Sequence, residues 1–118
     1  MEDEFNRSFT PAANYKRDRP AKGYWVISVR IIDQAKYDAY LSIATDAIDS
    51  LGGRVVIRSS SVLAAAGAPK PRLVIVEFPC LQDAKTAFDD VAQQSAMLMY
   101  QKIAEYDLAI VEGYDEFG

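Results

Sequence analysis

Histidine is absent from this 118-residue sequence, and Cys80 is its only cysteine. The absence of histidine excludes His-based catalytic triads, His-ligated haem and His-containing zinc sites. A single cysteine cannot form an internal disulfide, and it leaves no cluster of soft metal ligands. We therefore expect no metal site and no cofactor, and any general acid or base must be Asp, Glu, Tyr, Lys, Cys or water.

Positive charge is also scarce, because 13 Lys and Arg face 17 Asp and Glu, which gives a net charge of −4. Nucleic-acid binding needs a basic surface, so we expect no nucleic-acid partner. No apolar run reaches the length of a transmembrane helix, and the first residues, MEDEF, lack the apolar stretch of a secretory signal. These features favour a cytoplasmic protein without a membrane partner. The composition, 50% hydrophobic and 25% charged, is typical of one globular domain.

Hydrophobic patterning predicts strands and helices in the order βαββαβ. Runs of β-branched and aromatic residues predict the strands, and apolar residues at three- and four-residue spacing predict the helices. The expected strands are Tyr24–Ile32, Arg54–Arg58, Arg72–Phe78 and Leu108–Glu112, and the expected helices run from an N-cap at Asp33 to Gly52, from about Leu81, and over about Gln93–Glu105. This is the order of an α+β, ferredoxin-like fold, in which two helices cover one face of a four-stranded antiparallel sheet. Residues 22–118 are expected to form this domain, and residues 1–21 a flexible N-terminal arm.

The predicted strands are apolar on both faces, although two helices can cover only one. In the first strand, Trp25, Ile27 and Val29 form the row expected to face the helices. The helix-free face is expected to collect Val26, Val56, Leu73, Ile75, Leu108 and Ile110. An apolar face of this size is unusual on a monomer, so we expect a second copy to cover it. The sequence thus predicts a homodimer in which two sheets stack face to face.

Four separated motifs resemble the domain-of-unknown-function family 1330. They are Gly23-Tyr24-Trp25, Gly52-Gly53-Arg54, the stretch Pro71–Pro79 and Val111-Glu112-Gly113, which together span about residues 22–113. The resemblance implies a ferredoxin-like fold and a dimeric α/β barrel, and it implies no particular activity. The sequence departs from the family pattern at Cys80, where members usually carry a serine that would cap the second helix. It also departs near Tyr100, where members usually carry an arginine.

The candidate ligand-binding residues are charged and phenolic. They are Tyr24, Arg30, Arg58, Glu77 and Glu112 in the predicted strands, and Tyr100 in the late helical stretch. Glu77 and Glu112 could act as an acid or base, or could simply pair with nearby arginines. Arg30 and Arg58 could clamp a carboxylate, or could pair with these same glutamates. The apolar helix stripe that contains Tyr37 and Tyr40 favours core packing for both, so Tyr24 is the better pocket candidate.

We hypothesise that the protein is a homodimer that binds a small organic molecule in a cavity beside the sheet. One alternative is a non-catalytic assembly domain whose charges are all paired internally. Another is a cofactor-free oxygenase or isomerase, an alternative that rests on fold analogy alone. A cavity of a few hundred cubic ångströms at the polar cluster would favour ligand binding, and a salt-bridged interior would favour the assembly domain.

Overall fold

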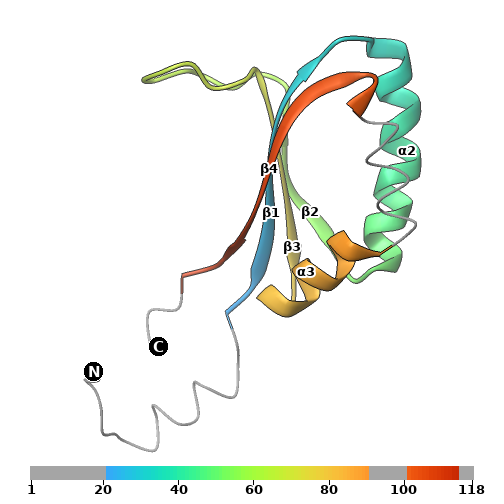
Figure 1. The fold of residues 1–118 in the computed structure, drawn as a ribbon. Coiled ribbons are helices and arrows are strands. Elements are labelled where there is room, and N and C mark those ends of the chain that lie inside the picture. Colours follow the sequence, from blue (N-terminus) through green and yellow to red (C-terminus); the bar gives the residue numbers. More distant parts are fainter. Residues whose placement is uncertain (1–20, 91–100, 115–118) are drawn as a thin grey trace, which may run out of the picture.

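The computed structural model describes residues 21–90 and 101–114, and it has the predicted βαββαβ order (Figure 1). Its elements are β1 (Gly23–Ile31), α2 (Gln34–Ser50), β2 (Arg54–Ser59), β3 (Arg72–Phe78), α3 (Leu81–Asp89) and β4 (Ala104–Glu112). The strands form one antiparallel sheet in the order β2-β3-β1-β4. Both helices lie on the same side of this sheet, so the ferredoxin-like fold is confirmed (Figure 1).

The two central strands, β1 and β3, alternate as predicted. Trp25, Ile27 and Val29 are buried, whereas the residues between them are partly exposed. The same alternation in β3 buries Val74, Val76 and Phe78. The register places Trp25 opposite Val76 and Val26 opposite Ile75, so the buried rows of both strands face the helices.

The ends of α2 follow from local sequence chemistry. The Asp33 carboxylate accepts a hydrogen bond of 3.0 Å from the backbone N–H of Lys36, so Asp33 is the N-cap that was predicted. At the other end Gly52 has φ +88°, and the N–H of Gly53 donates to the carbonyl of Ile48 at 2.9 Å. This pattern is a Schellman motif, and its left-handed residue is the glycine that was predicted to end the helix.

Two glycines of the family motifs sit where a side chain would collide with the fold. A Cβ atom on Gly23 would lie 2.4 Å from the carbonyl oxygen of Cys80, where the chain enters α3. A Cβ atom on Gly53 would lie 2.8 Å from the ring of Phe78. Close approaches between elements, and not a binding site, therefore explain the glycines in these two motifs.

The prediction for β4 was wrong in its start and in its facing. The strand begins at Ala104, in a stretch expected to be helical, and its register places Leu108 opposite Ile27 and Ile110 opposite Trp25. Leu108 and Ile110 therefore pack on the helix side and not on the helix-free face. The polar residues Glu105 and Asp107 lie in the row of β4 on the helix-free face. The alternation of polar and apolar residues in this strand therefore starts at Ala104.

The facing of Arg58 was also predicted wrongly, because β2 contains a bulge. Val55 lies opposite Val76, but the next paired residue is Ile57, opposite Ile75. The extra residue, Val56, shifts the alternation by one position. Ile57 therefore lies on the helix-free face, and Arg58, opposite Val74, lies on the helix side.

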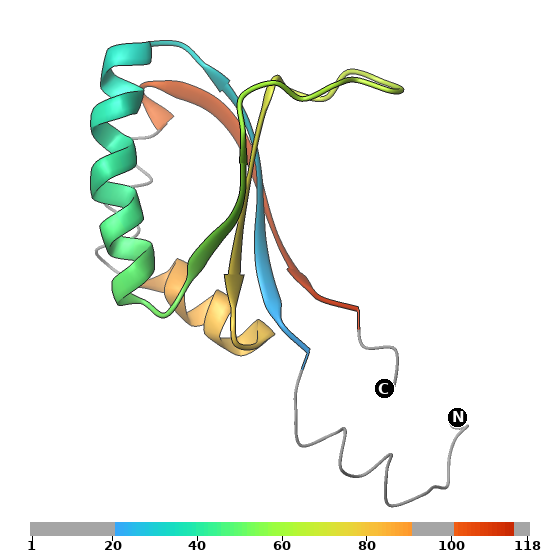
Figure 2. The ribbon, with the colours of Figure 1, turned by 180° about the vertical axis from the view of Figure 1, so that it is seen from behind.

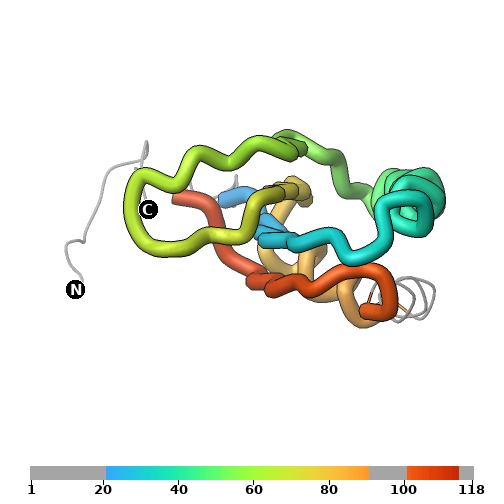
Figure 3. Tube along the Cα trace, turned by 90° about the horizontal axis from the view of Figure 1, so that it is seen from above, coloured from blue at the N-terminus to red at the C-terminus, as the bar shows by residue number. Residues whose placement is uncertain are grey.

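The connection between β2 and β3, residues 60–71, projects from the top of the sheet away from α2 (Figures 2 and 3). Its Leu63 is 91% exposed. Of the predicted N-terminal arm, residues 1–20 lie outside the described part of the chain, as do residues 91–100 of the predicted helical stretch. Within residues 21–90 and 101–114, no helix is both long and apolar enough to cross a membrane.

Candidate functional site

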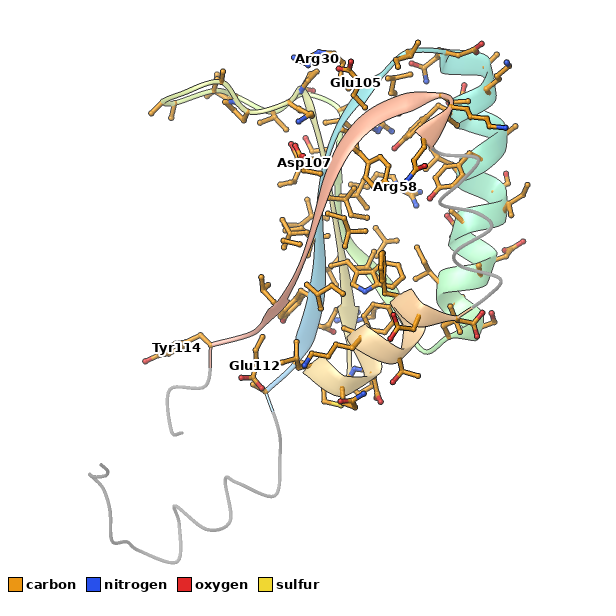
Figure 4. The ribbon with its side chains drawn as sticks, viewed as in Figure 1. Arg30, Arg58, Glu105, Asp107, Glu112 and Tyr114 are labelled. Carbon is orange, nitrogen blue, oxygen red and sulfur yellow. The ribbon has the colours of Figure 1, made fainter. Side chains whose placement is uncertain are left out.

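The six residues predicted to bind a ligand do not form one cluster. Arg30 pairs in register with Glu105, whereas Glu112 pairs with Gly23 at the other end of β1, about 23 Å away at the usual rise per residue. Figure 4 shows Arg30 and Glu112 at opposite ends of the sheet, and it shows Arg58 on the side of α2. Tyr100 lies outside the described residues. A common polar cavity that joins Arg30, Arg58 and Glu112 is therefore ruled out by the register.

Glu77 lies on the helix-free face and is bonded from two sides. Arg54 Nε lies 3.1 Å from Glu77 Oε1, and the Tyr24 hydroxyl donates to Oε2 at 3.1 Å. The bond from Arg54 is the main reason that the pKa of Glu77 lies below its ordinary value. Burial opposes this effect, and the bond from Tyr24 lowers the pKa further. Burial and the bond to Glu77 raise the pKa of Tyr24. Tyr24 and Glu77 are thus hydrogen-bonded to each other, and Glu77 is also paired with Arg54.

The other charges on the helix-free face are paired as well. Arg30 lies 3.8 Å from Glu105, with both side chains more than half exposed, and Lys70 forms an ion pair with Asp107. The first pair is visible at the top of the sheet in Figure 4. On this face the described residues show salt bridges rather than a polar cavity.

Replacing Glu77 by glutamine should remove part of the acid sensitivity of folding. A carboxyl with a lowered pKa in the folded state stabilises the protein above its unfolded pKa, and this stabilisation is lost as the pH falls through the lowered value. The loss at neutral pH should be below about 1 kcal/mol, because Arg54 is 74% exposed and solvent screens the pair. Urea midpoints measured between pH 7 and about pH 3 should therefore fall less steeply for Glu77→Gln than for the wild type.

Glu112→Gln is the matched control for this measurement. Glu112 is exposed at the end of β4, so the same chemical change should leave the slope of the wild type intact. Parallel pH profiles for Glu77→Gln and the wild type would contradict the assignment of the lowered pKa to the contacts with Arg54 and Tyr24.

A second group of polar residues lies on the helix side of the sheet. It consists of Tyr37 and Tyr40 of α2 and Tyr106 of β4, here called the tyrosine cluster. The rings of Tyr37 and Tyr40 are 6.1 Å apart, and both residues are buried. Burial, with smaller effects from the hydroxyls of Tyr37 and Tyr106, raises the pKa of Tyr40 far above its ordinary value. Tyr40 therefore keeps its proton and remains a hydrogen-bond donor at any ordinary pH.

Two arginines flank the tyrosine cluster. The Arg72 guanidinium lies 5.0 Å from the centre of the Tyr37 ring, within cation–π range. Arg58 donates a hydrogen bond of 3.0 Å to the hydroxyl of Thr45 on α2. Beside Arg58, a cavity of about 30 Å³ lies between α2 and the sheet, which is the space of one water molecule.

A larger groove opens where Tyr106 reaches the edge of the sheet. Its volume is about 640 Å³, and it is lined by residues of α3, β4 and the turn before β4: Phe88, Gln101, Ala104, Glu105, Tyr106, Asp107 and Leu108. This volume is in the range of small-molecule sites. Phe88, Tyr106 and Leu108 give the groove an apolar wall, and Gln101, Glu105 and Asp107 give it a polar rim.

Tyr106 and Arg72 were not among the residues singled out in the sequence. The signal for Tyr106 was the alternation of Ala104, Tyr106 and Leu108 with the acids Glu105 and Asp107, which marks a strand four residues longer than expected. The signal for Arg72 was its position two residues before Val74 in the buried row of β3. Within the described residues, no three His, Cys, Asp or Glu side chains are grouped so that they could hold a metal ion.

Known structures share this fold at low sequence identity. A protein of unknown function from Rhodopseudomonas palustris is 17% identical, with a TM-score of 0.63 over 92% of this chain and 96% of that one. SnoaB, a cofactor-independent oxygenase from Streptomyces nogalater, is 6% identical, with a TM-score of 0.61 over 80% and 95%. HapK from Hahella chejuensis is 14% identical, with a TM-score of 0.55 over 78% and 92%.

No curated protein matches the chain. The family model of a domain of unknown function, DUF1330, matches residues 22–114, which include every described strand and helix. The chain therefore belongs to the DUF1330 family.

Proposed function

We propose that the protein is a cytoplasmic homodimer that binds a small organic molecule in the groove beside β4. The observation that carries the binding proposal is the groove itself, which combines a volume of about 640 Å³ with an apolar wall and a polar rim. Ligand sites usually have this combination, because apolar surface supplies affinity and a few polar groups fix the orientation of the ligand.

The dimer proposal is supported by the composition of the helix-free face. With the corrected facings of β2 and β4, its apolar residues are Val26, Ile57, Leu73, Ile75, Ala109 and Val111. Ile57 is 42% exposed and Val111 is 41% exposed in the single chain. A continuous apolar sheet face of this kind is usually covered, and the matching face of a second copy is the simplest cover.

The charges on this face fit the same arrangement. The bonds of Tyr24 and Arg54 to Glu77 lie at one end of the strands, and the pairs Arg30–Glu105 and Lys70–Asp107 lie towards the other. The apolar residues therefore occupy the centre between two sets of paired charges, as in the core and rim of a protein interface. The connection 60–71, with its exposed Leu63, projects on this same side (Figure 1).

In the assembly-domain alternative, the protein is also a dimer, but it binds no ligand. The paired charges of the helix-free face agree with it. The groove, however, follows the β4 edge of the sheet, where the apolar wall of Phe88, Tyr106 and Leu108 leaves an open space beside the paired Glu105 and Asp107. The likeness to SnoaB is a likeness of fold alone, so it assigns no oxygenase or isomerase activity to this chain.

Native mass spectrometry of the purified protein tests both parts of the proposal. We expect the mass of two chains and a retained small molecule that dissociates at higher collision energy. Leu108→Trp places a large ring in the wall of the groove, so this variant should keep the two-chain mass and lose the retained molecule. Ile43→Trp adds the same ring on α2 at a position that is 51% exposed and outside the groove, so it should behave like the wild type.

A retained molecule that persists unchanged in Leu108→Trp would show that the groove is not the site. The absence of any retained molecule, combined with no thermal shift from a panel of organic acids, alcohols and amines, would favour the assembly domain.

A further inference from the structure

The connection between β2 and β3, residues 60–71 and here called the β2–β3 loop, is apolar and exposed. From Ser59 to Pro69 the sequence carries no charge. The run Leu63–Pro69 is exposed throughout in the single chain. The backbone N–H of Val62 donates to the carbonyl of Pro71 at 3.2 Å, which holds the base of the loop closed. An apolar segment held out in solvent in this way is typical of a surface that contacts a partner.

The length of the β2–β3 loop matches the spacing of two stacked sheets. The loop projects on the helix-free side, which a second copy covers in the proposed dimer (Figures 1 and 3). Leu63 follows Ser59, the last residue of β2, by a stretch that spans about 13 Å when extended. Stacked sheets lie about 10 Å apart. Leu63 can therefore reach the level of the partner's sheet, and the alanines that follow it lie beyond that level.

Two-fold symmetry and aligned strands allow two ways to stack the helix-free faces. The strands β2 and β4 are the opposite edges of the sheet. If the two-fold axis runs along the strands, β2 of one copy stacks on β4 of the other, and the same ends of the two sheets meet. If the axis runs across the strands, β2 stacks on β2, and the loop of one copy meets the opposite end of the other sheet.

The β2–β3 loop and the groove beside β4 lie at the same end of the sheet. Arg72, where the loop enters β3, is in register with Val29, and Val29 is in register with Tyr106 of the groove. With the two-fold axis along the strands, the loop therefore meets the partner's β4 where the groove opens.

The chemistry of the two ends favours this arrangement. At the groove end, the two carboxylates of the rim are already paired within the chain, and the apolar wall of the groove is available to Leu63. The opposite end carries Glu112 and the pair Arg54–Glu77. An uncharged loop placed there would cover charged groups and offer them no counter-charge, which costs free energy.

We propose that the β2–β3 loop of each copy lies along the β4 edge of its partner and closes the partner's groove with Leu63 and the alanines that follow it. This inference rests on the dimer and the groove of the proposed function. It adds that each binding site is built from two chains, because the groove is open along β4 in the single chain and is enclosed only when a second copy supplies its loop.

Disulfide trapping in the full-length protein tests the inference. Cys80→Ser first removes the only native cysteine. In that background, Leu63→Cys adds a thiol to the loop, and Glu105→Cys adds one to the rim of the groove. After oxidation, the double variant should run at the mass of two chains on a denaturing gel without reductant. Each single-cysteine variant should run as one chain, because neither thiol faces its own copy across the two-fold axis.

Leu63→Cys combined with Glu112→Cys is the matched control. Glu112 is exposed at the other end of β4, so this pair should stay at the mass of one chain. A two-chain product from this pair would place the loop at the opposite end of the partner and overturn the inference. The inference would also be overturned if Leu63→Cys with Glu105→Cys gave no cross-link, or gave one within a single chain, since the loop would then not reach the partner's groove.

The dissociation constant of the dimer provides a second measurement. Leu63 is 91% exposed in the single chain, so Leu63→Ser should leave its circular dichroism spectrum unchanged. The lost burial of a leucine against the partner should weaken association at least tenfold in sedimentation experiments. Ile43→Ser, at a position that is 51% exposed on α2, should have no effect. A wild type of two chains whose association is unchanged by Leu63→Ser would refute the role of the loop and leave the proposed function intact, whereas a wild type of one chain would refute the dimer itself.

Discussion

Ile75→Asp is expected to convert the protein from two chains to one in sedimentation-velocity experiments at micromolar concentration. Ile75 lies near the centre of the helix-free face, opposite Val26 on one side and Ile57 on the other. In a dimer of stacked sheets, an aspartate there would be buried without a partner, at a cost of several kcal/mol. Since each 1.4 kcal/mol changes a dissociation constant tenfold, a loss of this size weakens association by a factor of about a thousand or more.

The single chain should survive this substitution, because the side chain of Ile75 does not belong to the helix-side core. The circular dichroism spectrum of Ile75→Asp should therefore match that of the wild type. Ile43→Asp is the control, since Ile43 is 51% exposed on α2 and away from the helix-free face, and it should remain a dimer. A wild-type protein that sediments as one chain would refute the dimer itself, and a dimeric Ile75→Asp would place the interface elsewhere.

The parts of the fold that the sequence predicted well are those that depend on local chemistry. The bounds predicted for β3, Arg72–Phe78, were confirmed, because a stretch rich in β-branched residues and closed by Phe78 ends at Pro79, which cannot donate to the sheet. The N-cap at Asp33 and the glycine that ends α2 were confirmed for the same kind of reason. A cap needs only its own residue and the next turn of helix, so neighbouring strands do not alter it.

The parts that failed depend on how strands pair. Nothing in Arg54–Arg58 reveals that Val56 is an extra residue, because a bulge is defined by the partner strand that it faces. The predicted facing of β4 was wrong for a different reason. Leu108 and Ile110 are apolar, and so are their neighbours Ala109 and Val111, so these four residues do not distinguish the two faces of the strand. Only the stretch before Leu108, with Glu105 and Asp107, distinguishes the two faces.

These two errors explain part of the dispersal of the predicted site. Arg58 and Glu112 were assigned to the same face as Arg30 and Glu77, but the register places both on the helix side. The register also places Arg30 and Glu112 at opposite ends of the sheet. The pairing of Glu77 with Arg54 was among the possibilities that the sequence allowed. The tyrosine cluster and Arg72 could not be assembled from sequence alone, because they join α2, β3 and β4 through the register of the sheet.

Trp25 is the residue whose loss should cost the most stability. It is fully buried in the central strand β1, with its ring centre 4.9 Å from that of Phe78 and 6.2 Å from that of Phe88. Its Nε1–H donates a hydrogen bond of 2.9 Å to the carbonyl of Ala84, which ties α3 to the sheet. One side chain thus joins β1, β3 and α3, and α3 forms one wall of the groove.

Trp25→Ala should lower the free energy of unfolding by about 3–5 kcal/mol, because it removes the ring and leaves a cavity that the sheet cannot close. This is a large part of the roughly 5–15 kcal/mol that stabilises a typical domain. Trp25→Phe keeps most of the apolar contact and leaves the Ala84 carbonyl without its donor, so it should cost only about 1–3 kcal/mol. Urea unfolding followed by circular dichroism measures both variants, at one chain concentration because dimerisation contributes to the midpoint. Equal losses for the two variants would show that the hydrogen bond to Ala84, and not the packing of the ring, holds α3 on the sheet.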